Sequence, residues 1–174
     1  MNILTRSLAA SFFAAVMTLM SVSALAQGKS LKDQIVGTWI FVSALDVHAD
    51  GKKTDRWGPN PKGMFMFDKD GRFMQMLTRS DIPRFAGKRV DEGTPEEYKA
   101  VMVNVVASFG TYTVNEAERT VTTTVEGSVF PNLVGVAQKR RIVTLDAKEL
   151  KYTNPATTMG TTAEATWKRA TPQN

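Results

Sequence analysis

Few residues in this chain are of the types that do chemistry, and their spacing matches none of the common catalytic motifs. The sequence contains no cysteine and one histidine, His48, which alternation places on the opposite face of its strand from Trp39. It has no Gly-x-Ser-x-Gly nucleophile motif and no pair of histidines for zinc. We therefore expect no hydrolase chemistry, no metal site and no cofactor, and we interpret His48 as a surface residue.

The remaining polar candidates lie on the later strands of the chain. They are Tyr112, Glu126, Ser128, Gln138, Arg140 and Arg141. On the strand that contains Glu126, the more apolar face is formed by Val121, Thr123 and Val125. Because side chains alternate between the two faces of a strand, Glu126 and Ser128 are predicted to face outward, as solvated or rim residues.

Arg140 is the best single candidate for a contact with a ligand. It shares one face of its predicted strand with Gln138 and Ile142, so it can point inward and hold the polar end of a bound molecule. The alternative is a cofactor-free isomerase or cyclase, with Glu126 or Asp46 as base and Tyr112 as acid. The sequence favours binding without catalysis, and no catalytic residue is predicted.

A hairpin over residues 63–78 brings apolar residues together on two faces. The Asp68-Lys69-Asp70-Gly71 turn suits a type I turn with a G1 bulge, which pairs Phe67 with Phe73. In this register one face carries four methionines, which are Met64, Met66, Met74 and Met76. Methionine suits both a ligand cavity and a face packed under a helix, and both interpretations stay open. Whichever of these two roles the methionine face has, the aromatic face of the hairpin is expected to have the other.

The elements that must position these residues are mostly strands. The first strand is predicted over 38–47 and begins at Gly37-Thr38-Trp39. Its predicted inward face consists of Trp39, Phe41, Ser43, Leu45 and Val47. Short strands separated by turns continue to the C-terminal end. We therefore predict an all-β fold, an antiparallel up-and-down barrel of about eight strands with one inserted α-helix.

The helix and the segment before it have clear signals. Thr94-Pro95-Glu96-Glu97 is a capping box with proline at the first helical position, and Gly110 is a natural stop. An apolar stripe of Tyr98, Val101, Met102, Val105, Val106 and Phe109 predicts that the helix packs on one side. The segment 78–93 is long, basic and turn-rich, and two interpretations stay open, a lid that attracts an amphipathic anion and the more common solvated loop.

Eight short blocks in order resemble the bacterial lipocalin-like domain family of small exported proteins. They are Gly37-Thr38-Trp39, Gly58-Pro59-Asn60-Pro61-x-Gly63, Ile82-Pro83-Arg84-Phe85, Gly93-Thr94-Pro95-Glu96-Glu97-Tyr98, Phe109-Gly110-Thr111-Tyr112, Val125-Glu126-Gly127-Ser128-x-x-Pro131-Asn132-x-x-Gly135, Gln138-x-Arg140-Arg141 and Trp167-Lys168-Arg169. The resemblance implies a lipocalin-like barrel and the binding of small apolar molecules. It also implies that Arg169, from the last strand, covers Trp39 at the closed end of the barrel, beside Gly37.

Residues 1–26 are predicted to be a cleaved signal peptide, and 27–174 to be one lipocalin-like domain. Arg6 provides the positive n-region, residues 8–19 the apolar h-region, and Ala24-Leu25-Ala26 the cleavage site. We expect a periplasmic or secreted protein, with no stable membrane insertion after cleavage. The net charge of +5 is scattered, so no nucleic-acid partner is expected.

These observations predict an exported protein that binds a small apolar or amphipathic molecule inside a β-barrel. The predicted ligand-binding residues are Trp39, Phe41, Met64, Met66, Met74, Met76, Tyr112 and Arg140, and Gly37, Trp39 and Arg169 are predicted to close the barrel. A filled barrel that acts as a ligand-free interaction module is a further alternative. The size of the cavity separates this alternative from the other two.

Overall fold

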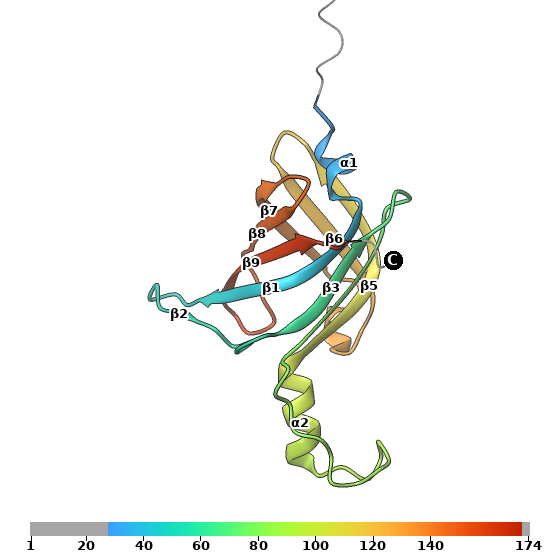
Figure 1. The fold of residues 1–174 in the computed structure, drawn as a ribbon, viewed down its shortest axis with the longest axis vertical. Helices are drawn as coiled ribbons and strands as arrows, with labels where there is room; N and C mark the ends of the chain where they lie inside the picture. The colour runs from blue at the N-terminus through green and yellow to red at the C-terminus, as the bar shows by residue number, and fades with distance from the viewer. Residues whose placement is uncertain (1–27, 172–174) are drawn as a thin grey trace, which may run out of the picture.

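Strand β1 (Gly37–Val47) closes the sheet into a barrel, because it pairs with a strand on each of its edges. The computed structural model describes residues 28–171, and the predicted signal peptide lies outside this range. The strand order is β2-β1-β3-β4-β5-β6-β7-β8-β9, and β1 also pairs with β9, so the barrel has eight wall strands (Figure 1). All pairs are antiparallel, which confirms the predicted fold class.

The other elements follow in chain order, mostly joined by short turns. They are α1 (Leu31–Ile35), β2 (Lys53–Thr54), β3 (Lys62–Phe67), β4 (Arg72–Thr78), α2 (Pro95–Asn104), β5 (Val105–Asn115), β6 (Thr120–Ser128), the 3-10 turn η1 (Pro131–Leu133), β7 (Ala137–Leu145), β8 (Glu149–Asn154) and β9 (Thr162–Arg169). No helix within residues 28–171 has the length and apolar character needed to cross a membrane.

The β3–β4 hairpin has the predicted register but turns its methionine face to solvent. Phe67 pairs with Phe73, and Phe65 and Phe67 are at most 3% exposed. The four methionines, by contrast, are 44–57% exposed. The prediction that Met64, Met66, Met74 and Met76 line a cavity is therefore wrong, and so is the alternative that they pack under the helix. Aromatic rings bury more apolar surface than methionine, so the barrel closes around the aromatic face.

A β-bulge in β1 shifts the inward face of its second half. The pairing with β9 changes register between Phe41 and Ser43, and Ser43 faces outward. Beyond the bulge, Ala44 and Asp46 are buried, while Leu45 is 37% exposed. The predicted inward set is therefore right at Trp39 and Phe41 and wrong at Ser43, Leu45 and Val47, because a bulge adds one residue and reverses the alternation.

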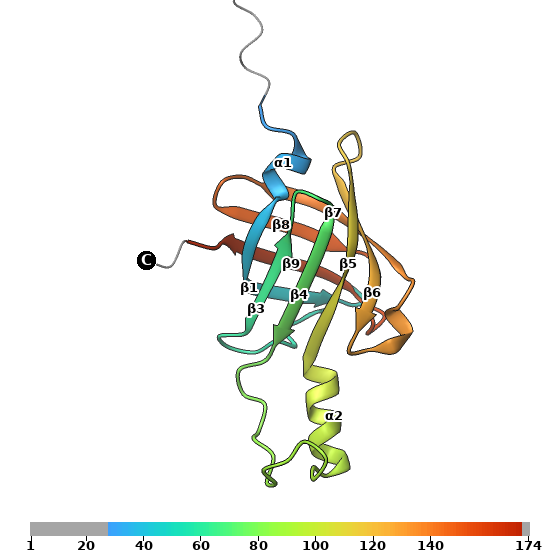
Figure 2. The ribbon, with the colours of Figure 1, turned by 90° about the vertical axis from the view of Figure 1, so that its right-hand side faces the viewer.

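The helix α2 begins as predicted but ends earlier than predicted. Thr94 and Glu97 form the complete capping box, and the helix stops at Asn104 instead of near Gly110. The following residues include the β-branched Val105 and Val106, which pair with β4 as the start of β5. No residue of α2 is buried, so the predicted packed stripe is wrong. The helix projects beyond one end of the barrel (Figure 2).

Replacing Thr94 with alanine is expected to destabilise α2 by about 1 kcal/mol, since the Thr94 hydroxyl accepts a hydrogen bond from the Glu97 backbone N–H. Because α2 buries none of its residues, this loss should stay local. Amide hydrogen exchange should become about fivefold faster in α2, with no change in the barrel strands. Thr94→Ser is the control that keeps the cap. An equal increase of the amide exchange rate in the barrel strands would contradict a local effect.

Candidate ligand-binding cavity

One end of the barrel is closed by Arg169. Its guanidinium lies 3.8 Å from the centre of the Trp39 ring and donates hydrogen bonds of 2.6 Å to the carbonyl oxygens of Gln34 and Val36. Gly37 has φ +123°, and a Cβ there would lie 2.7 Å from Arg169 Nη1. A side chain at residue 37 would therefore be strained and would collide with the arginine. The arginine–tryptophan stack expected from the resemblance is present.

Two other predicted ligand-wall residues have structural roles, Tyr112 at this end and Phe41 in the barrel core. Tyr112 donates a 2.6 Å hydrogen bond to the carbonyl of Asp68 in the β3–β4 turn, and its ring lies 5.0 Å from that of Phe67. Phe41 packs between Trp57 and Trp167, with ring centres 5.5 and 4.9 Å away.

The barrel contains a cavity of about 230 Å³ away from this closed end, near the start of β5. Its walls are mostly apolar and include Ala44, Trp57, Leu77, Val106, Leu133 and Ala165. Its principal polar residues are Asp46, Arg56, Gln75, Gln138, Arg140 and Tyr152. Trp39, Phe41 and Tyr112 are not among the lining residues, so of the predicted ligand-binding residues only Arg140 lies on the cavity.

Arg140 is buried at the cavity without a carboxylate partner. It is 3% exposed, and within residues 28–171 no acidic oxygen lies within 4 Å of it. Its Nη1 donates to Thr123 Oγ1 at 2.6 Å and to the Gln138 carbonyl at 3.3 Å, and its Nη2 donates to Gln138 Oε1 at 2.9 Å. Its Nε has no partner. The guanidinium also lies 5.4 Å from the Phe65 ring centre and 5.6 Å from that of Tyr152.

The other two charged residues at the cavity pair with each other. Arg56 Nε lies 3.6 Å from Asp46 Oδ2, and the Arg56 guanidinium lies 4.5 Å from the centre of the Trp57 ring. Burial lowers the pKa of Arg56, and the Asp46 carboxylate opposes this shift. The arginine therefore keeps its charge beside a buried counter-ion.

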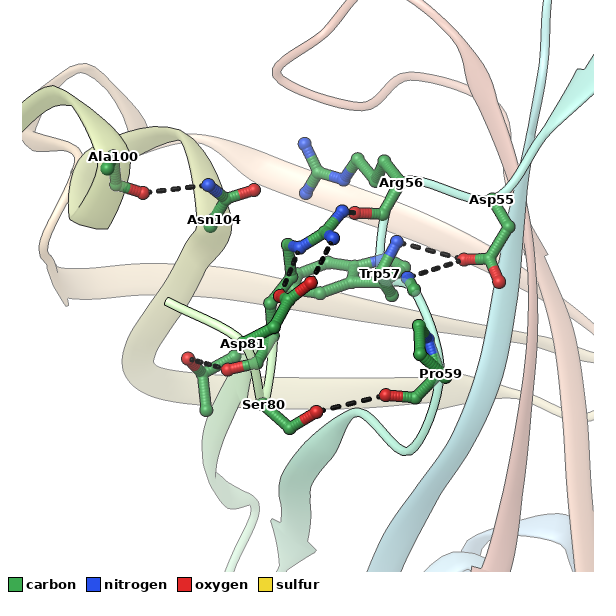
Figure 3. A network of polar contacts seen from close by, with 11 residues as sticks. Asp55, Arg56, Trp57, Pro59, Ser80, Asp81, Ala100 and Asn104 are labelled. Carbon is green, nitrogen blue, oxygen red and sulfur yellow. Dashed lines mark hydrogen bonds and ion pairs between the residues drawn. The ribbon is translucent and has the colours of Figure 1, made fainter. Parts of the chain in front are cut away.

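A polar network holds the segment that carries Trp57 at the edge of the cavity (Figure 3). Asp55 Oδ1 accepts a 2.9 Å hydrogen bond from the Trp57 backbone N–H. Arg79 donates a 2.7 Å hydrogen bond to the Arg56 carbonyl and a 2.6 Å bond to Asp81. These bonds tie the end of β4 to the loop before β3 and fix the cavity wall there.

A family model described as a lipocalin-like domain matches residues 36–170, nearly all of the described chain. The chain belongs to the lipocalin-like domain family. No curated protein sequence matches it.

Solved structures similar to this lipocalin-like domain have low sequence identity. A redesigned β-barrel, mFAP1, bound to DFHBI, is 16% identical over 81% of this chain and 100% of that chain, with a TM-score of 0.42. A bovine odorant binding protein with a selenium-containing odorant is 16% identical over 84% and 76%, with a TM-score of 0.41. The Rhodnius prolixus amine binding protein in its tryptamine complex is 12% identical over 80% and 65%, with a TM-score of 0.40.

The lipocalin-like domain keeps its predicted acid–base candidates apart. Glu126 faces solvent, as predicted, and forms an ion pair of 2.8 Å with Arg72. Tyr112 is bonded at the closed end, and Asp46 alone lies on the cavity, next to Arg56. The isomerase or cyclase hypothesis built on Glu126 and Tyr112 needs both residues inside the cavity, and neither residue lies there. His48 is exposed and bonded to a surface threonine, as predicted.

The predicted lid lies against α2 and contributes no residue to the cavity. None of residues 79–93 lines it. The Phe85 ring lies 5.5 Å from that of Tyr98, and the Ala86 backbone N–H donates to Glu97. The segment is thus folded onto the helix beyond the end of the barrel.

The cavity residues that reasoning from the sequence missed include Gln75, Tyr152 and Trp57. Gln75 alternates with Phe73 and Leu77 on the aromatic face of the hairpin, and a polar residue at such a position is a signal that could have been used. Tyr152 alternates with the buried Leu150 in the same way. Trp57 lies in a loop, where alternation gives no signal.

Proposed function

We propose that this lipocalin-like domain is an exported protein that binds one small apolar or amphipathic molecule in the barrel cavity and does not transform it. The observation that carries this proposal is a cavity of about 230 Å³ with mostly apolar walls and one buried, unpaired arginine. Binding sites for small molecules combine apolar walls with a few polar groups that fix orientation. An engineered apolar cavity of about 150 Å³ binds benzene, so this cavity has room for a ring with a short substituent.

Export is part of the same proposal. The n-region, h-region and Ala24-Leu25-Ala26 site of residues 1–26 support cleavage before Gln27 and release into the periplasm or the medium. The mass of the protein recovered from the periplasm tests this point. A chain that begins at Gln27 is expected, and an uncleaved chain in the membrane fraction would contradict it.

Fluorescence of 1-naphthylamine, an uncharged apolar probe of two fused rings, tests ligand binding. Saturable binding of one probe per chain is expected. Ala44 and Ala165 face each other on β1 and β9 and both line the cavity, so Ala44→Leu should fill part of it with an isopropyl group. We expect this change to lower the affinity for the probe by at least about tenfold, since the leucine occupies volume that the probe needs.

Ser43→Leu is the matched control for that variant. Ser43 is the preceding residue and faces outward because of the β1 bulge, so its replacement should leave the affinity for the probe unchanged. Absence of saturable binding to the unmodified protein would contradict the proposed function. That result would indicate a filled barrel that acts by contacts with other proteins.

A further inference from the structure

The charges that face the cavity do not cancel. Its lining contains two arginines, Arg56 and Arg140, and one carboxylate, Asp46, and no other charged residue of the described chain lines it. Asp46 pairs with Arg56, so the cavity keeps one positive charge, on Arg140. A buried charge is costly unless it is paired and hydrogen-bonded. The cavity is therefore best suited to a ligand with one negative charge.

Arg140 has more N–H donors than it has acceptors within hydrogen-bond distance. A guanidinium has five N–H groups, and those of Arg140 make three hydrogen bonds, two through Nη1 and one through Nη2. The Nε–H and one N–H of Nη2 take no part in these bonds, so the guanidinium has spare donors as well as an uncompensated charge.

The neighbours of Arg140 bring no negative charge to it. Tyr152 lines the cavity beside it, with its ring centre 5.6 Å from the guanidinium. Burial raises the pKa of Tyr152, an effect that the charge of Arg140 and hydrogen bonding with Arg140 and Trp167 oppose, and the hydroxyl stays protonated at neutral pH. An ionised carboxylate supplies the counter-ion that Arg140 lacks.

The anion is more consistent with a carboxylate than with a phosphate. Arg140 supplies one uncompensated positive charge, which the single negative charge of one carboxylate balances. A phosphate dianion would bring a second charge, and the only other arginine at the cavity is already paired with Asp46. The apolar walls fit the remainder of an amphipathic acid.

We propose that the ligand is a small monocarboxylate with a single ring or a short branched chain, whose carboxylate pairs with the buried guanidinium of Arg140. This inference rests on the proposed function and specifies its ligand class.

Displacement of 1-naphthylamine by 3-phenylpropionate and by its uncharged amide tests the ligand class. The acid should displace the probe from the unmodified protein about 10- to 100-fold more effectively than the amide, which is the range for hydrogen bonds to charged groups. Arg140→Met should remove this preference while the probe still binds. Arg141→Met, on the exposed neighbour of Arg140 on β7, should keep the preference.

The outcomes separate the two proposals. If the probe binds but the amide competes as well as the acid, the carboxylate proposal is overturned and the proposed function stands. Persistence of the preference in Arg140→Met would also overturn it, because the acid would then bind elsewhere. If neither probe nor acid binds the unmodified protein, both proposals fail. Should Arg140→Met not fold, the ratio of acid to amide on the unmodified protein decides the question alone.

Discussion

Replacing Phe65 with alanine is expected to lower the free energy of unfolding by about 4 kcal/mol, whereas Met64→Ala should change it by less than about 0.5 kcal/mol. The Phe65 side chain is 0% exposed, and its ring centre lies 4.2 Å from that of Phe67 and 5.5 Å from that of Trp167. Met64 is the preceding residue on β3 and is 49% exposed. Urea denaturation followed by tryptophan fluorescence measures both changes.

The pair of variants tests which face of the hairpin forms the core. Phe65→Leu is a further control, since it keeps an apolar side chain and should cost clearly less than Phe65→Ala. Similar losses for Phe65→Ala and Met64→Ala would contradict the assignment of the aromatic face to the interior.

The hairpin also shows what the sequence could determine and what it could not. The turn chemistry of 68–71 fixed which residues pair, because a type I turn with a G1 bulge permits one register. The choice between the two faces depends on what packs against each of them. Both faces are apolar, so alternation alone could not decide between them, and the larger apolar surface of the aromatic rings decided it.

The bulge in β1 had a larger effect on the candidate site. One extra residue near Val42 reverses the faces of Ala44, Leu45 and Asp46 relative to strict alternation. No glycine marks this bulge, so the sequence has no local signal for it. Asp46 and the space beside Ala44 were consequently assigned to the outside, although both belong to the cavity.

The helix boundary and Arg140 illustrate two further cases. The capping box gave the start of α2, but its end depends on Val105 pairing with Thr78, a tertiary contact that outweighs helical periodicity. Arg140 was found because alternation places it on the same strand face as Gln138 and Ile142, which was expected to point inward. Its partner Thr123 follows from pairing in the sheet and has no sequence signal of its own.

One arginine, Arg169, closes one end of the barrel. Replacing it should lower the free energy of unfolding almost as much as replacing an aromatic residue of the core. Arg169→Ala is expected to lower the free energy of unfolding by about 3 kcal/mol. The change removes the stack on Trp39, worth about 1–2 kcal/mol when partly desolvated, and two hydrogen bonds to the carbonyls of Gln34 and Val36. Those carbonyls lie at the junction of α1 and β1, so α1 should also become more mobile.

The measurement is thermal unfolding combined with hydrogen exchange across residues 30–40. Arg169→Lys keeps the charge but neither the planar stack nor the fork of donors, so it should recover only part of the loss. Lys168→Ala, on the exposed neighbouring residue, should have little effect. If Arg169→Lys were as stable as the unmodified protein, charge alone would explain the contribution of Arg169. The stack on Trp39 would then have no measurable part in closing the barrel.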